Sequence, residues 1–190
     1  HLSDSPFLNF DLGKPFKIFL AISVIFTLGT FSEAFLILRA QSVGIPLYQI
    51  FIILAVFSAV TSIVFLPAGI LSDRLGRKRF IILGWLTAAA AFAGFALSSS
   101  AWHIWIFYLL FGVFFGTTEG VARAFIVDLV PANLKATAFG VYNSFVGVTL
   151  FPSSVIAGFL WQTFSPAAPF FFSATIAVIA AALLLFFKEK

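Results

Sequence analysis

The chain contains neither cysteine nor methionine among its 190 residues, and only 9% of those residues are charged. Without cysteine, the sequence offers no disulfide framework and no thiolate metal site. A soluble domain carries about 25% charged residues, so this chain has too few polar groups to cover a surface that faces water. Hydrophobic residues make up 62% of the sequence instead. The composition therefore predicts an integral membrane protein whose outer surface faces lipid.

The shortage of reactive side chains excludes other classes of function. The formal net charge is +4, but the basic residues lie in short stretches beside apolar runs and form no separate basic domain. We therefore expect no nucleic-acid partner. Two histidines, no cysteine and no carboxylate pair at a catalytic spacing argue against an enzyme. We also expect no cofactor and no bound metal.

The start of the sequence is unusual, because position 1 is His1 and no signal peptide is visible. Together with the absence of methionine, this indicates a fragment of a longer chain, or an engineered one. The polar residues 1–14 are expected to form a cytoplasmic segment in front of the membrane domain, which occupies residues 15–190.

Six apolar segments are each long enough to cross about 30 Å of hydrocarbon, which takes roughly 20 helical residues. Strands usually run for about 4–8 residues, and an open sheet edge would leave backbone groups unpaired in lipid. The sequence therefore predicts an all-α integral membrane protein with a bundle of six transmembrane helices. The predicted helices are Pro15–Ala40, Leu47–Ser72, Arg79–Leu97, Trp102–Val130, Leu134–Gln162 and Ala167–Phe187.

The basic residues predict the orientation of these helices. With six crossings, the basic residues on one side are Lys14, Lys17, Arg74, Arg77, Lys78, Arg79, Lys135, Lys188 and Lys190. On the opposite side there is only Arg39, while Arg123 lies within the fourth segment. Lysine and arginine concentrate in cytoplasmic loops. We therefore expect both termini in the cytoplasm of a multi-pass protein of the plasma membrane, such as a bacterial inner membrane.

The connection after the second segment carries the most specific pattern. It reads Gly69-Ile70-Leu71-Ser72-Asp73-Arg74-Leu75-Gly76-Arg77-Lys78-Arg79. This stretch resembles the signature loop of major facilitator superfamily transporters, G-x-L-a-D-r-x-G-r-k, with Ser72 in place of the usual small alanine. A loop that only follows the positive-inside rule would contain the arginines but not the ordered Gly, Asp and Gly.

Each residue type in this loop has a physical reason. Gly69 would let the second helix approach a neighbour closely, and Gly76 would permit a turn with positive φ. Asp73 could accept backbone N–H groups at a helix N-terminus, and Arg77 could pair with the carboxylate of Asp128 at the end of the fourth helix. The resemblance implies a conformational latch that holds one access state, formed by Gly69, Asp73, Arg74, Gly76, Arg77, Lys78 and Asp128.

A second stretch is similar to the junction of the tenth and eleventh helices in many bacterial members of this superfamily. It runs from Glu119 to Ala124, continues through Asp128 to Pro131, and ends with residues 135–140. The resemblance implies the C-terminal half of the fold, built from two three-helix repeats, with residues 1–14 as the tail of the central loop.

The halves of such transporters rock against each other around a site near the middle of the membrane. The resemblance therefore implies a secondary transporter half that moves a small solute by alternating access. Its partner would be the missing six-helix half or a second copy of this chain in a homodimer. A half that folds but moves nothing is the alternative.

Charged residues inside the membrane need a reason, because each costs at least about 2.5–3.5 kcal/mol at the centre of the bilayer. Glu119 and Arg123 lie four residues apart on the fourth helix, on the same general face as the glycine row Gly112, Gly116 and Gly120. They form either a solute or proton site, or an ion pair that only lowers its own desolvation cost.

Two further polar groups lie on other helices. Glu33 follows a polar stripe on the first helix that consists of Ser23, Thr27 and Thr30. It could exchange a proton during transport, face water, or pair with Arg39.

The fifth helix carries a stripe of small and polar residues, which are Gly140, Asn143, Ser144, Gly147, Ser154 and Gly158. The stripe predicts a close-packing seam or, alternatively, a cavity wall in which Asn143 binds the solute. The candidate solute or proton site therefore comprises Glu33, Glu119, Arg123 and Asn143.

Overall fold

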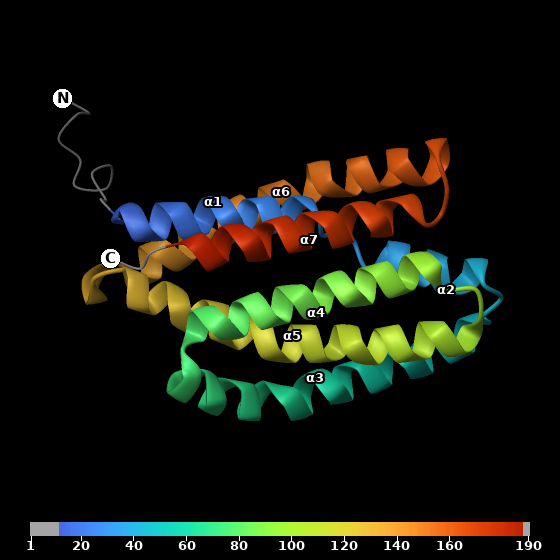
Figure 1. Ribbon diagram of the computed structural model, residues 1–190, viewed down its shortest axis with the longest axis horizontal. Helices are drawn as coiled ribbons and strands as arrows, with labels where there is room; N and C mark the ends of the chain where they lie inside the picture. The colour runs from blue at the N-terminus through green and yellow to red at the C-terminus, as the bar shows by residue number, and fades with distance from the viewer. Residues whose placement is uncertain (1–11, 188–190) are drawn as a thin grey trace.

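The computed structural model describes residues 12–187, and within that range the chain contains helices and no strand. The helices are α1 (Lys14–Leu28), α2 (Ala34–Ser42), α3 (Leu47–Leu75), α4 (Arg77–Leu97), α5 (Ala101–Leu129), the 3-10 turn η1 (Ala132–Leu134), α6 (Lys135–Thr163) and α7 (Ala168–Phe186). The long helices run side by side along the bundle (Figure 1). The polar segment 1–14 and the terminal lysines Lys188 and Lys190 fall largely or wholly outside the described residues.

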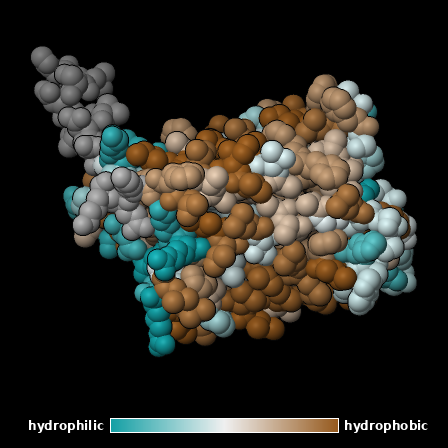
Figure 2. Space-filling model, in the orientation of Figure 1, coloured by the Kyte–Doolittle hydropathy of each residue, from teal (hydrophilic) through white to brown (hydrophobic). Residues whose placement is uncertain are grey.

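Five stretches within residues 12–187 are long and apolar enough to cross a membrane. They correspond to α3, α4, α5, the stretch Ala132–Thr163 that contains α6, and α7. Figure 2 shows apolar residues over the middle of the visible face and hydrophilic residues at its two ends. Together these features describe a multi-pass membrane protein, as the composition predicted.

The first predicted span is not one helix, so the prediction of a continuous helix over Pro15–Ala40 was wrong. It is divided into α1 and α2 by residues 29–33. At about 1.5 Å per residue, the 15 residues of α1 cover only about 22 Å, which is less than the hydrocarbon thickness. Helices α1 and α2 follow one another along the bundle (Figure 1), and neither is among the five stretches that are long and apolar enough to cross a membrane.

The break has a local and a tertiary cause. Gly29, Thr30 and Ser32 are poor helix formers, which lowers the cost of interrupting the helix there. Gly29 also lies so close to α7 that a Cβ atom at this position would be 2.7 Å from the Cβ of Ile176. The close packing of α1 on α7 therefore needs a glycine where the helix ends.

Helix α4 lies at the centre of the packing, with α5 on one side and α7 on another, while α3 packs on α5 and α1 packs on α6 and α7. The contact between α3 and α5 is close because of the glycine row on α5. A Cβ at Gly116 would lie 2.8 Å from the carbonyl oxygen of Thr61, and one at Gly112 would lie 3.1 Å from that of Phe57. These glycines therefore pack as small residues do between membrane helices.

The small residues of α6 behave differently, and in the described part of the chain only the C-terminal part of the stripe, with Ser154 and Gly158, packs against residues of the first predicted span. A Cβ at Gly140 or Gly147 would meet nothing within 4 Å, and Asn143 and Ser144 are exposed. Only 17% of the most apolar stretch around α6 is buried, and 11% of that of α3, against 56% for α4. Helices α3 and α6 therefore carry the least covered apolar surfaces of the bundle.

Most of the basic residues that the structure describes, all except Arg39 and Arg123, gather near one end of the bundle. The start of α1, the turn between α3 and α4, the start of α6 and the end of α7 all lie at that end in Figure 1. Those elements carry Lys14, Lys17, the basic residues of the signature loop and Lys135. The helix order therefore brings together the lysines and arginines that the sequence placed on one side.

Candidate functional site

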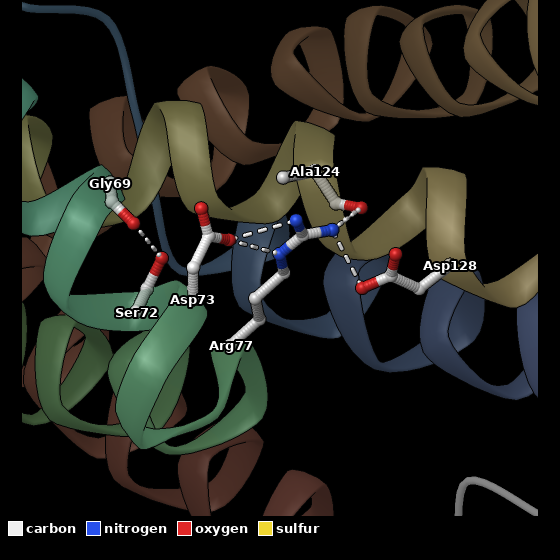
Figure 3. Close-up of polar contacts among 6 residues, drawn as sticks. All are labelled: Gly69, Ser72, Asp73, Arg77, Ala124 and Asp128. Atoms are coloured by element: carbon white, nitrogen blue, oxygen red, sulfur yellow. Dashed lines mark hydrogen bonds and ion pairs between the residues drawn. The ribbon is translucent and has the colours of Figure 1, made fainter.

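The signature loop forms a network of charges between α3, α4 and α5 (Figure 3). The Nε and Nη2 atoms of Arg77 donate to Asp73 Oδ1 at 3.0 and 2.8 Å, and Nη1 donates to Asp128 Oδ2 at 2.7 Å. The same Nη1 donates to the backbone carbonyl of Ala124 at 2.8 Å. One guanidinium therefore joins the end of α3 to the end of α5, and the expected contact between Arg77 and Asp128 is present in the structure.

Two expectations about this loop were wrong. Asp73 does not cap the backbone of α4, whose N-terminus has no side-chain cap, because its carboxylate faces Arg77 instead. Gly69 makes no close contact with another helix of residues 12–187, since a Cβ there would meet nothing within 4 Å. Its carbonyl accepts a hydrogen bond of 2.8 Å from Ser72 Oγ. Gly76 does adopt a positive φ of 97°.

Two further basic residues of the loop differ in their surroundings, since Lys78 binds another helix and Arg74 faces outward. Lys78 Nζ donates to the carbonyl oxygen of Leu185 at 3.1 Å and to that of Phe187, which are at the C-terminal end of α7. Free carbonyl groups at a helix C-terminus attract a cation, so Lys78 ties the loop to α7. Arg74 is exposed.

A cavity of about 440 Å³ lies on another part of the molecule, and all four residues of the candidate solute site line it. Glu33 comes from the break between α1 and α2, Glu119 and Arg123 come from α5, and Asn143 comes from α6. Pockets for small molecules usually measure about 300–1,000 Å³ and combine apolar walls with a few polar groups. The structure therefore brings together residues that are far apart in the sequence, such as Glu33 and Asn143, which are separated by 110 positions.

The wall of the cavity is mainly aromatic. Its aromatic lining residues are Phe26, Phe31, Trp85, Phe92, Phe111, Phe114, Phe115 and Tyr142. Thr118 also lines it, with a buried hydroxyl that has no hydrogen-bond partner among the described residues. A cavity of this kind can hold an organic solute with an apolar body and a few polar atoms.

Glu119 and Arg123 form an ion pair of 2.6 Å within α5, between Oε1 and Nη2. Both side chains are at least half exposed and line the cavity. The glycine row of α5 packs on α3 instead, so the charged pair and the glycines use different sides of the helix. The pair can thus meet a solute, although it also satisfies its own charges.

Glu33 is exposed at the break, and the described residues include no ion-pair partner for it. The expected alternative of a pair with Arg39 was wrong. Arg39 instead donates to the carbonyl oxygens of Phe95, Ala96 and Ser98 at 2.9, 3.0 and 2.7 Å. It caps the C-terminal end of α4, which satisfies carbonyl groups that have no partner in their own helix.

Two contacts between the break and α6 were missed by the sequence reasoning. Ser153 Oγ donates to the carbonyl oxygen of Thr30, and the backbone N–H of Ser32 donates to Ser154 Oγ at 3.4 Å. Ser154 was noted only as one of the small residues of the fifth predicted helix. The run from Gly29 to Ser32 is the one local signal, because its residues favour turns over helix. No pattern in the sequence pairs these positions, which are more than 120 residues apart.

Within residues 12–187, no group of three or more His, Asp or Glu side chains could hold a metal ion. The polar groups of the cavity are two carboxylates, one guanidinium, one amide and several hydroxyls. Such a set can bind and orient a solute or carry a proton.

Comparison with known proteins identifies similar chains. The sequence model of the Major Facilitator Superfamily matches residues 18–190. An MFS-type transporter of Methanocaldococcus jannaschii, MJ1317, is 37% identical over 186 residues, which are 93% of this chain and 46% of the relative. The tetracycline resistance protein, class B, of Escherichia coli is 31% identical over 73% of this chain and 34% of its own length.

A third relative is Multidrug resistance protein 2 of Bacillus subtilis, which is 30% identical over 65% of this chain and 30% of its own length. The chain therefore spans less than half the length of each of these three relatives.

Proposed function

The chain belongs to the Major Facilitator Superfamily, and from that premise we propose that it forms one side of the solute pathway of a secondary transporter. The observation that carries the proposal is the cavity, where four charged or polar side chains from three parts of the fold meet among aromatic rings. The solute would be a small organic molecule. The printed names of the relatives from Escherichia coli and Bacillus subtilis, which refer to tetracycline and to multidrug resistance, support that class.

The transport cycle would use alternating access, in which two six-helix halves rock around the site. In this scheme the signature loop acts as the latch of one access state. Arg77 holds α3 and α5 together through Asp73 and Asp128, and Lys78 holds α7. Opening the other side requires these contacts to break, which makes them a part of the energy difference between the two states.

The second wall of the cavity would come from a further six-helix half or from a second copy of the chain. Support comes from α3 and α6, which leave large apolar side chains uncovered, such as Phe51, Leu66, Phe145 and Phe151. The basic end of the bundle would lie on the cytoplasmic side of the plasma membrane, with both chain ends on that side.

Glu33 and Glu119 are the candidates for proton coupling. Each carboxylate lines the cavity, where a group that can gain and release a proton would lie beside the solute. Glu33 is the better placed of the two, since Glu119 already pairs with Arg123. A proton would then bind in one access state and leave in the other.

The test uses the full-length protein that contains this chain, reconstituted into liposomes, with uptake of organic solutes measured with and without a proton gradient. We expect gradient-dependent uptake that Glu33→Gln reduces more strongly than Glu119→Gln. Uptake that neither substitution changes would defeat the proton site. If no solute moves in any condition, the chain is a membrane scaffold rather than a transporter half.

The partner is tested separately. A full-length sequence of about twelve helices would supply the second half within one chain. If the full-length sequence has only six helices, crosslinking between α3 and α6 of two copies in native membranes should trap a homodimer. A protein that stays monomeric under those conditions would contradict the proposal that a second copy supplies the other wall of the cavity.

A further inference from the structure

The break between α1 and α2 leaves backbone groups that no helix can satisfy. A helix pairs each N–H with the carbonyl four residues earlier, and that ladder stops where residues 29–33 leave the helical path. In hydrocarbon an unpaired backbone group costs several kcal/mol. A break in a membrane span therefore persists only where other groups bind the freed N–H and carbonyl.

Two adjacent serines of α6 supply those groups. Ser153 Oγ donates to the carbonyl oxygen of Thr30, while Ser154 Oγ accepts the N–H of Ser32 at 3.4 Å. Ser153 is 2% exposed, so its contact with the break is shielded from competing water. The two hydroxyls have opposite roles, and together they bind one carbonyl and one N–H on either side of Phe31.

The break is held from α7 as well. Gly29 lies directly against Ile176, where even a methyl group would overlap. Pro152 lies next to the two serines inside α6. Because proline has no N–H, α6 lacks one bond of its helical ladder beside the two serines, although the helix continues through this position. Residues 29–32 are therefore fixed between two helices.

The residues fixed in this way carry part of the cavity wall. Phe31, Ser32 and Glu33 all line the cavity, and Glu33 follows directly after the residue that binds Ser154. We propose that Ser153 and Ser154 are positioning residues, which hold the break and thereby place the Glu33 carboxylate and the Phe31 ring at the solute site. This inference rests on the proposed function only where it concerns the solute.

Two other hydroxyls on α6 bind their own helix and not the break. Ser144 Oγ donates to the carbonyl oxygen of Gly140, and Thr149 Oγ1 donates to that of Phe145, both in their own helix. Such back-bonding to the fourth residue before is common and local. Ser144→Ala is therefore a matched control, because it removes a serine hydroxyl from the same helix without touching the break.

The first experiment measures amide hydrogen exchange of the full-length protein in lipid nanodiscs, in peptides that cover residues 29–36. Loss of a hydrogen bond of ordinary strength should raise the exchange rate there about fivefold in Ser153→Ala/Ser154→Ala. Ser144→Ala should leave the exchange rate unchanged. With Ser153→Ala in place, threonine instead of alanine at position 154 should restore protection of the Ser32 amide, because threonine keeps a hydroxyl. Unchanged exchange in the double variant would overturn the proposal.

The second experiment reports the position of residue 33 without needing transport. Since the chain contains no cysteine, Glu33→Cys introduces a single thiol into this region, with any cysteine elsewhere in the full-length protein replaced by serine. Its rate of labelling by a charged maleimide should change at least fivefold when Ser153 and Ser154 are both alanine. An equal rate in both backgrounds would overturn the positioning role.

Solute uptake completes the test. In the double variant, KM should rise severalfold while the maximal rate and the amount of folded protein stay near those of the wild type. Faster exchange with an unchanged KM would contradict the role at the solute site. If the wild type moves no solute, the proposed function fails, while exchange and labelling still decide whether the serines position the break.

Discussion

The chain contains two pairs of an arginine and a carboxylate four residues apart, and the two pairs have opposite surroundings. Arg77 pairs with Asp73, reaches Asp128 and the Ala124 carbonyl on α5, and leaves 26% of its side chain exposed. Arg123 pairs with Glu119 on its own helix, and 66% of its side chain is exposed. The two ion pairs themselves are both short, at 2.8 and 2.6 Å.

The difference between the pairs lies in the third group. An exposed pair at this spacing on one helix contributes only about 0.3–0.5 kcal/mol. The Asp73–Arg77 pair joins α3 to α4, and Asp128 and the Ala124 carbonyl extend that link to α5, whereas the Glu119 pair stays within one helix and faces the cavity. The same local motif can thus hold a fold together or remain available to a ligand.

The largest expected effect is on stability at the loop. Arg77→Ala should lower the free energy of unfolding by about 2 kcal/mol, because it removes charge-assisted hydrogen bonds that join two helices. Arg123→Ala should lower it by less than about 0.5 kcal/mol. Reversible unfolding in mixed detergent micelles, followed by the fluorescence of the four tryptophans, measures both. Equal losses at the two arginines would remove the distinction between the pairs.

The next effect is on transport at the cavity. Glu119→Gln and Arg123→Gln each leave the opposite charge without its partner, so KM for an organic ion should change about tenfold, or about 1.4 kcal/mol. The direction should be opposite for the two variants when the solute is charged. Uptake by the full-length protein in liposomes measures KM, with unfolding as the control for stability. Unchanged KM in both would make the pair purely structural.

A smaller effect is expected in the coupling free energy between the two side chains of each pair. A double-mutant cycle on Arg77 and Asp128 should give a coupling free energy of about 1 kcal/mol, because the two side chains are in direct contact. The same cycle on Glu119 and Arg123 should give about 0.3–0.5 kcal/mol. The cycles need only the unfolding assay. Additive effects of Arg77→Ala and Asp128→Ala would show that Arg77 does not couple the loop to α5.

The smallest effect concerns Lys78, which caps α7. Lys78→Gln should cost about 0.5 kcal/mol of unfolding free energy, as expected for a cation removed from a helix C-terminus. Arg74→Gln should cost close to nothing, because that side chain is exposed. Raising the salt concentration should shrink the Lys78 effect. A loss at Arg74 as large as that at Lys78 would place the two residues in the same role.

Much of the fold could be predicted because its signals are local. Long apolar runs predict spans wherever they occur, and the five stretches from α3 to α7 lie close to the predicted ranges. Arg77 and Asp128 could be paired because an arginine readily binds a carboxylate, and the end of the fourth predicted helix lies on the same side of the membrane as the signature loop. Glu33, Glu119, Arg123 and Asn143 could each be chosen as polar groups that are costly in lipid.

The parts that could not be predicted depend on neighbours that are distant in sequence. The break at residues 29–33 is held by Ser153, Ser154 and Ile176, and hydropathy alone does not reveal these contacts. Asp73 was assigned to a helix N-terminus by its position in the chain, but the nearer cation Arg77 takes its carboxylate. The glycines of α6 suggested a seam, yet no helix of the described chain covers Gly140 or Gly147.

The divided first span has a consequence for the synthesis of the protein. Ser32 and Ser154 are 122 residues apart, and ribosomes add about 5–20 residues per second. After Ser32 is synthesised, roughly 6–24 s therefore pass before its hydroxyl partner on α6 has been translated. During that interval α1 and α2 need water, lipid headgroups or a chaperone to accommodate their free backbone groups, so this crossing reaches its final shape among the last parts of the bundle.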